Sequence, residues 1–492
     1  MKSAPPFIRP PLVLATAFAP RAPLLALVFS ALLLAGCAAF GPEHPPMPST
    51  TASALGLTGA NSMQVAPRWW TSLNDPRLNQ LVDLALLGSP NLAVARARLD
   101  RASALAEISR ASARPQVNLS AEVTRQRYTE NGLIPPPIAG NVRDNATLQT
   151  SFSWSPDFLG GHTADIAAAL GQARAAQADV AAASNALAAQ VSRAYVSLAR
   201  LLAQREVAQR TLAQRDEFLG LTRQRTSAGL DSQVELAQAE GALPDTRAQI
   251  EALDEQITLV QRQVAVLTGQ APNALDDLSP SLTALTLEPM PATLGADLLG
   301  RRPDVAAARW RVEAATQDVT LARIQFYPNM NLTAFIGLNA LGLGNLIEAG
   351  SLQYGITPAL RLPVLDGGRL RAQLGGRQAD LDGAIAQYNG VLLDAVKEAG
   401  DAIGSGQSLE RQQREQTAAL QSAEKAYAFS VQRYQAGLSS YLVVLNAESQ
   451  LLAQRRLAVD LRARQFDTRV ALMKALGGGW TDDTASMSVA AH

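Results

Sequence analysis

The sequence predicts a mainly helical chain with a membrane β part, built from a duplicated helix–strand–strand–helix–helix unit. The stretches 157–243 and 364–492 contain no proline although the chain holds 27, and this is typical of very long helices. Four shorter segments alternate apolar and polar residues, as strands with one buried face do. Landmarks of the first half recur in the same order in the second half, which indicates an internal duplication.

The composition argues against several classes of function. The 43 basic and 43 acidic side chains cancel, so no net charge favours binding to nucleic acid. With 47% apolar but only 5% aromatic and 17% charged residues, the chain resembles alanine-rich helices more than an enzyme core. The three histidines, His44, His162 and His492, are too widely spaced along the chain for a metal site or a catalytic triad. We therefore expect no catalytic residues, metal ligands or cofactors.

Residues 1–36 have the pattern of a lipoprotein signal peptide. An apolar run follows Arg21, is shorter than the ~20 residues of a membrane-spanning helix, and ends in Leu34-Ala35-Gly36-Cys37. Because Cys37 is the single cysteine, we predict cleavage before it and a covalent lipid, N-acyl and S-diacylglycerol, on it. By analogy with lipoprotein sorting, Ala38 indicates the outer membrane. The alternative is a small buried cysteine after an ordinary signal peptide.

The remaining chain divides into two repeats and their connections. Residues 37–75 are rich in Pro, Ser and Thr and are predicted to be an N-terminal tether and equatorial segment. The repeats are predicted at 76–268 and 294–477, joined by a linker at 269–293 and followed by a tail at 478–492. The paired landmarks of the repeats are Pro90 and Pro303, Pro115 and Pro328, Gly160 and Gly367, and Gly229 and Gly437.

Each repeat is expected to begin with a helix that ends before a proline, at about 76–113 and 294–324, and Pro90 and Pro303 are each expected to open a helical stretch within these ranges. Strands are predicted at about 116–127, 145–155, 329–338 and 351–361, as two hairpins. No apolar stretch of ~18 residues follows the lipid site, so a membrane role would have to use these strands. If their apolar face meets lipid, the polar face lines an aqueous lumen. The residues predicted to face that lumen are Asn118, Ser120, Thr147, Gln149, Asn331 and Gln353.

Long helices are predicted at about 160–228, 231–268, 367–436 and 439–476. A helix of the first length would span roughly 100 Å, more than an ordinary globular domain. Glycine turns reverse the chain between the helices of each pair, which predicts two antiparallel helical hairpins. A plain coiled coil is the alternative, but the frequent alanines allow each helix to pack on two sides.

Four strands cannot close a barrel, and an open sheet edge in lipid would leave backbone groups unpaired. Several copies must therefore share one barrel. We expect a trimer with an α-barrel and a shared 12-stranded β-barrel, four strands per chain, wide enough to hold water. The strand pattern itself fixes only that one copy is insufficient.

Two motifs carry a resemblance to a known family. The first runs from Arg301-Arg302-Pro303-Asp304-Val305 to Phe326-Tyr327-Pro328, and the second from Tyr434-Gln435-Ala436-Gly437 into the segment 440–448. With the duplicated order of elements, they make the chain resemble the TolC/OprM-type outer-membrane factors. The lipobox favours the NodT-like efflux lipoproteins of resistance-nodulation-division tripartite systems.

The resemblance implies an exit duct of a tripartite efflux pump. Such a duct passively conducts small molecules or drugs from an inner-membrane transporter and a periplasmic membrane-fusion adaptor to the outside. The family architecture is a homotrimer with a β-barrel in outer-membrane lipid, a periplasmic helical barrel and an equatorial region. Here that region would include Trp69-Trp70, residues 272–291 and the tail after Gly479.

The resemblance also implies a periplasmic gate that contacts between neighbouring hairpins keep closed until the adaptor engages. The residues placed at or near this constriction are Tyr434, Leu442, Val443, Asn446, Asp231 and Glu235. Family gates commonly carry aspartates at the positions of Val443 and Asn446, and this chain has neither acid there. Amides hydrogen-bond but do not hold cations as a carboxylate ring does, so we expect weaker block by multivalent cations than such a ring would give.

The glycine turns of the two hairpins are the predicted adaptor contacts. Gly229 and Gly437 permit the chain reversal, and each exposes a leucine beside it, Leu230 or Leu438. The plainer interpretation is a turn glycine that only ends a helix, and both can hold.

Two other classes of function remain open from the sequence. A lipid-anchored periplasmic scaffold would use the helices as rods and the strands as a small soluble sheet. Within transport, a type I secretion duct or a metal-efflux duct is the alternative. No substrate-selective pocket is readable, so the substrate is not predicted.

Overall fold

The structure is a computed structural model that describes residues 45–50, 53–55, 65–287 and 300–481. The predicted signal peptide and Cys37 lie outside these ranges, as do part of the predicted linker and most of the predicted tail. None of the helices in the described ranges is long and apolar enough to cross a membrane.

The chain divides into two compact units, a sheet unit and a helical unit. The sheet unit contains Pro115–Leu159 and Leu321–Gly376. The helical unit contains Pro46–Arg114, Gly160–Thr320 and the chain from Arg377 onward. Because both repeats contribute to both units, the duplication is built into each of them.

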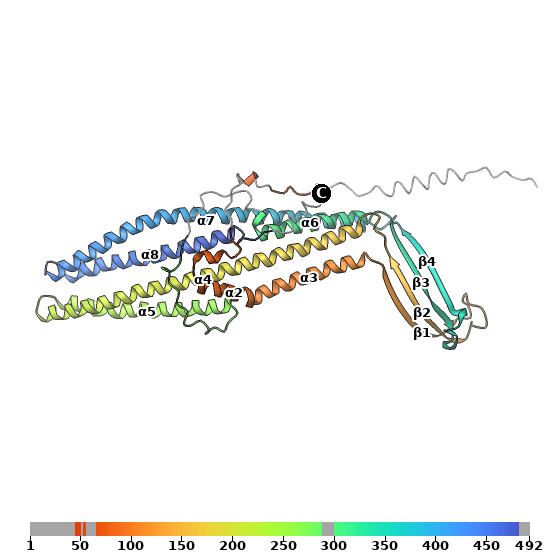
Figure 1. The fold of residues 1–492 in the computed structure, drawn as a ribbon, viewed down its shortest axis with the longest axis horizontal. Helices are drawn as coiled ribbons and strands as arrows, with labels where there is room; N and C mark the ends of the chain where they lie inside the picture. The colour runs from red at the N-terminus through yellow and green to blue at the C-terminus, as the bar shows by residue number, and fades with distance from the viewer. Residues whose placement is uncertain (1–44, 51–52, 56–64, 288–299, 482–492) are drawn as a thin grey trace, which may run out of the picture. The chain divides into compact units, whose positions relative to one another are not determined.

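The sheet unit is one antiparallel sheet in the order β1-β2-β3-β4 (Figure 1). Its strands are β1 (Gln116–Arg127), β2 (Val142–Trp154), β3 (Asn329–Leu341) and β4 (Leu352–Arg361). The pair β2 and β3 joins the first repeat to the second, so the two hairpins form a single sheet. β2 and β3 extend further toward the loops than predicted, because β2 still pairs with β1 at Val142 and with β3 at Leu341.

The two repeats give long helices of equal length. α4 (Gly161–Ser227) and α7 (Arg369–Gln435) each have 67 residues, and α5 (Gln233–Leu267) and α8 (Tyr441–Ala475) each have 35. Figure 1 shows the hairpins α4–α5 and α7–α8 as extended pairs. The observed ends lie within about two residues of the predicted ones, since glycine or serine marks each boundary.

The first helix of each repeat differs from the prediction. The sequence predicts one helix at about 76–113, whereas the structure has α2 (Pro76–Gly88) and α3 (Pro90–Ser112). The break falls at Ser89, whose backbone is extended (φ −69°, ψ 121°), because the residue before a proline is pushed out of the helical region. In the second repeat α6 (Pro303–Ile324) begins at Pro303, which the sequence predicted to open a helical stretch, and Arg302 before it is not helical. Residues 294–299 of the predicted helix lie outside the described residues.

The equatorial core of the helical unit lies about midway along α4. Trp69 and Trp70 of the short helix η2 (Trp69–Leu73) are 3% and 4% exposed and pack with α2 on α4. Leucines of the chain segment after α5 join the same cluster. Buried alanines of α4 and α6 also touch, and a Cβ at Gly171 would meet the Cβ of Ala314 at 3.0 Å.

Candidate functional site

The six polar residues predicted to line a lumen share one face of the sheet. Antiparallel partners lie on the same face, and the register pairs Ser120 with Gln149, Gln149 with Gly337 and Gly337 with Gln353. The other predicted residues follow at alternate positions along the same strands. The face therefore presents hydroxyl and amide groups across all four strands.

Side-chain hydrogen bonds cross this polar face. Gln353 Nε2 donates to Gln149 Oε1 at 3.0 Å, passing over β3 at Gly337, which has no side chain in the way. Asn339 Nδ2 donates to Thr147 Oγ1 at 2.8 Å. Asn339 was not among the predicted lumen residues because the strand was expected to end before it. Such groups are compatible with water on this side of the sheet.

The opposite face of the sheet is apolar and exposed. Leu119, Tyr354 and Ile356 are 72%, 76% and 70% exposed, and the register places Leu119 and Tyr354 in one row across the four strands. An apolar surface of this extent marks contact with lipid or with another protein. The two edge strands, β1 and β4, each have a hydrogen-bonded neighbour on one side only, so their outer backbone groups are open for pairing.

The hairpin tips have the same backbone geometry in both repeats. Gly229 and Gly437 have φ of 72° and 73°, a conformation that glycine adopts without strain. The next residue closes the helix end in each case: Leu230 N donates to Arg225 O, and Leu438 N donates to Arg433 O, both at 2.8 Å. Leu230 and Leu438 are 66% and 70% exposed, so each tip presents a leucine.

A polar cluster, here called the tip lock, connects the two hairpins and consists of Arg225, Asp231 and Tyr434. Tyr434 is fully buried, and its hydroxyl donates to Asp231 Oδ2 at 2.6 Å. Arg225 donates to both carboxylate oxygens of Asp231, at 2.9 and 3.3 Å, and its guanidinium lies 4.7 Å from the centre of the Tyr434 ring. The lock thus fixes the end of α7 to the turn that joins α4 and α5.

The electrostatics of the tip lock favour the ionised carboxylate. Burial by itself would raise the pKa of Asp231, but the hydrogen bonds from Arg225 and Tyr434 outweigh it and lower that pKa. Burial and the neighbouring Asp231 carboxylate raise the pKa of the Tyr434 hydroxyl, which remains a donor. The two shifts support the same arrangement, a neutral phenol donating to a charged carboxylate.

The six residues predicted at the gate do not form one cluster. Tyr434 and Asp231 meet in the tip lock, whereas Leu442, Val443 and Asn446 lie on the exposed side of α8, turned away from it. Glu235, expected near the constriction, instead accepts from the backbone N–H of Ser232 at 3.0 Å and caps the start of α5. The Glu235 side chain can reach back to this N–H because Glu235 lies three residues after the capping Ser232.

A second link between the hairpins was not predicted. Arg215 of α4 donates through Nε to Glu448 of α8 at 3.0 Å and through Nη1 to Thr246 of α5 at 2.8 Å. The two charged side chains are only 10% and 7% exposed. Burial raises the pKa of Glu448, and Arg215 offsets part of that rise. Glu448 belongs to the second sequence motif, which is the signal that could have drawn attention to it.

The chain combines a sheet that has one polar and one exposed apolar face with two pairs of long helices, and this combination is typical of a membrane channel. The chain belongs to the family described as "Outer membrane efflux protein", which it matches over residues 81–270 and 294–478. The predicted family is thereby confirmed, and it is a transport family rather than a family of enzymes.

Curated relatives and solved structures agree with this assignment. The chain is 30% identical over 469 residues to the multidrug resistance outer membrane protein MdtP of Shigella flexneri, covering 93% of this chain and 96% of MdtP. It is 35% identical over 369 residues to the fusaric acid resistance protein FusA of Burkholderia cepacia, covering 72% of this chain and 69% of FusA. It also matches the crystal structure of VceC from Vibrio cholerae with a TM-score of 0.80 and 36% identity, over 84% of this chain and 99% of VceC.

The protein is therefore an outer-membrane efflux channel, and its predicted location in the outer membrane and its transport function are confirmed.

Proposed function

We propose that three copies of this chain form one exit duct, in which twelve strands close a β-barrel through the outer membrane and the long helices close a second barrel in the periplasm. The observation that supports it is the four-stranded sheet with two unpaired edges and an exposed apolar face. Unpaired backbone groups in lipid cost several kcal/mol each, so β4 of one copy pairs with β1 of the next. The polar face then lines a water-filled lumen.

The duct conducts small molecules passively and works with two partners, an inner-membrane transporter and a periplasmic adaptor. The names of MdtP and FusA refer to multidrug resistance and fusaric acid resistance, which supports small organic molecules as the substrates. The exposed leucines at Leu230 and Leu438 suit contact with an adaptor, since they are apolar, solvent-facing and held on rigid turns. The covalent lipid at Cys37 anchors the chain to the membrane.

The tip lock holds the periplasmic end closed. Its contacts join the two hairpins of one copy, while the exposed Leu442, Val443 and Asn446 are free to meet a neighbouring copy. Opening requires the Asp231 contacts to break, because they fix the end of α7. An adaptor that binds the tips would supply the free energy for that change.

The direct test is electrical conductance of the purified, lipidated protein in planar lipid bilayers, together with its mass in detergent. We expect discrete conductance steps from particles of three chains. A stable single chain that gives no conductance would refute the duct.

A membrane-extraction experiment separates the duct from a lipid-anchored scaffold. The Cys37→Ala variant, secreted with a cleavable signal peptide, should remain in the outer membrane and resist carbonate extraction because its strands are inserted. A variant that becomes fully soluble would favour the scaffold, in which acyl chains are the sole attachment.

A further inference from the structure

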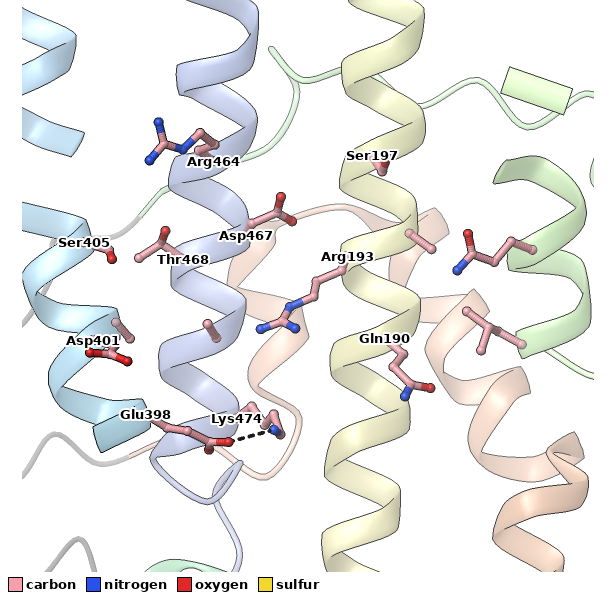
Figure 2. A pocket seen from close by; sticks show the side chains of 15 residues that line it. Gln190, Arg193, Ser197, Glu398, Asp401, Ser405, Arg464, Asp467, Thr468 and Lys474 are labelled. Carbon is pink, nitrogen blue, oxygen red and sulfur yellow. Dashed lines mark hydrogen bonds and ion pairs between the residues drawn. The ribbon is translucent and has the colours of Figure 1, made fainter. Parts of the chain in front are cut away.

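A polar groove crosses the helical unit near the equatorial core. Its volume is about 1060 Å³, and side chains from α4, α5, α7 and α8 line it. In Figure 2 the labelled side chains come from three neighbouring helices, and Arg193 and Asp467 both point into the space between α4 and α8. None of these residues belongs to the sheet faces or to the hairpin tips described above.

The groove borders the equatorial core, since Ala194 and Ala402 belong to both, and its charged side chains lie away from the large core side chains of the same helices. Its residues on α4 and on α8 are spaced by three and four, so each helix turns one stripe toward the groove. The groove stripes are Gln190, Arg193, Ala194 and Ser197 on α4, and Arg464, Asp467, Thr468 and Ala471 on α8. The core stripes are Ala188, Val191, Tyr195 and Leu198 on α4, and Ala463, Phe466, Val470 and Met473 on α8. In the proposed trimer an open lumen leaves no room for the equatorial segments inside the tube, so the side of α4 that they cover faces outward and the charged side of the groove faces the lumen.

Three cations and three acids line the groove, and two of the cations, both arginines, lie outside any ion pair in the described part of the chain, whereas the third, Lys474, pairs with Glu398 at 3.4 Å. Arg193 and Arg464 are exposed and have no ion pair within the described residues. The acids beside them are already occupied: Glu398 accepts from Arg302 at 3.1 Å, and Asp401 pairs with Lys397 at 2.7 Å. The two guanidinium groups are thus the cations of the groove that no described ion pair engages.

The remaining acid of the groove, Asp467, makes no ion pair among the described residues, and its Oδ1 is buried without a hydrogen-bond partner there. Burial raises the pKa of Asp467, and Arg193 and Arg200 offset only part of the rise. Apolar side chains stand between the charged groups, among them Leu267 and Ala402. A surface that combines two guanidinium groups with apolar patches suits a ligand with one anionic and one apolar end.

We propose that this groove is a transit site for organic anions, in which Arg193 and Arg464 contact a carboxylate and the apolar residues contact the rest of the molecule. The site rests on the proposed duct, since it places the groove on the lumen wall. Three copies present six such guanidinium groups at one level of the lumen. The groove is open to solvent and binds the anion weakly. Conduction requires weak binding, because a tight site would retain its ligand.

The test uses purified full-length protein in planar bilayers with salicylate, a small aromatic carboxylate, as the probe. The double variant Arg193→Gln with Arg464→Gln is compared with wild type and with Arg68→Gln, which removes an exposed arginine of the equatorial segment that pairs with Asp83. Both changes leave exposed positions polar, so the fold is retained. We expect the salicylate-to-potassium permeability ratio to fall roughly threefold or more in the double variant only.

Binding is measured separately by the intrinsic fluorescence of salicylate titrated with protein in detergent. Roughly tenfold weaker binding by the double variant, with Arg68→Gln unchanged, is the expected result. Channels that conduct normally while permeability and binding stay unchanged in the double variant overturn the transit site and leave the duct intact. Absence of conductance in wild type overturns the duct, and the transit site falls with it.

Discussion

The two hairpin tips share a backbone but differ in side-chain chemistry. Both turns have a glycine with φ near 72° and the same closing hydrogen bond at 2.8 Å. In the first tip Asp231 follows that glycine by two residues and pairs with Arg225, whereas Ser439 stands at the equivalent place in the second tip. The Ser439 hydroxyl is buried and has no hydrogen-bond partner among the described residues.

The helix starts after the turns differ in the same sense. Ser232 and Glu235 form a reciprocal capping box at the start of α5. At the start of α8 the corresponding residues are Ser440 and Val443, and Ser440 makes no side-chain cap. The two repeats therefore share the backbone shape of the turn, but only the first hairpin has the acids Asp231 and Glu235 that hydrogen-bond around it. The first tip restrains the second through Tyr434, and the reverse restraint does not exist among the described contacts.

The largest effect should follow Asp231→Ala. The change leaves the buried donors of Arg225 and Tyr434 without their acceptor, at a cost of about 2 kcal/mol to the closed form. A loss of that size raises the ratio of open to closed channels roughly thirtyfold. Single-channel recordings measure it, with Ser439→Ala as the matched control in the other tip, where we expect almost no change. Equal effects at the two positions would contradict the asymmetry.

Glycine-to-alanine changes should affect the two tips alike. Gly229→Ala and Gly437→Ala both place a side chain at positive φ, and neither Cβ would meet another atom within 4 Å. The cost then comes from the backbone alone and is about 1 kcal/mol for each. Thermal unfolding of the purified protein measures the two costs. A difference of more than about twofold would show that the turns are not equivalent.

A smaller gain is expected from giving the second tip the cap that it lacks. Val443→Glu places an acid three residues after Ser440, as in the first tip, and should stabilise the start of α8 by about 0.5 kcal/mol. Asn446→Glu introduces the same charge one turn further on and serves as the control. The idea fails if thermal unfolding shows the same shift for both variants.

The smallest effect is expected from mild acid. The ionised form of Asp231 stabilises the lock, and because its pKa is lowered in the folded protein, that contribution is present above the unfolded pKa and is lost only as the pH falls through the lowered value. An ordinary aspartate has a pKa of about 3.9, so conductance measured at pH 7 and at pH 5 should be the same. Opening between these two pH values that disappears in Asp231→Ala would refute the assignment.

Much of the fold was predictable because proline and glycine residues mark where its long helices begin and end. The limits of α4, α5, α7 and α8 follow from proline-free stretches and from the turn glycines. Pro90 was predicted to open a helical stretch, but the end of α2 just before it was not predicted, because apolar residues keep a helical spacing on both sides of Pro90. The polar face of the sheet was predictable because strict alternation needs no long-range information.

Individual residues of the candidate site could be predicted from the sequence, but the contacts that they make with distant segments could not. Asp231 and Tyr434 were predicted at the gate, but Arg225 was not, since it lies on the preceding helix and reaches Asp231 only after the turn. Likewise, the pairing of Arg215 with Glu448 joins charges that look like solvated helix surface in the sequence. Contacts between distant segments decide which charges are buried, and a single sequence does not encode them locally.

The equal helix lengths of the two repeats have a consequence for symmetry. Both hairpins have helices of 67 and 35 residues. The main chain of a trimeric tube would therefore have approximate sixfold symmetry, whereas its side chains would have threefold symmetry. A binding protein that contacts the exposed leucine of the turn would therefore find two near-identical sites per copy. One that contacts the acid at Glu235, which Val443 replaces in the second tip, would find a single site.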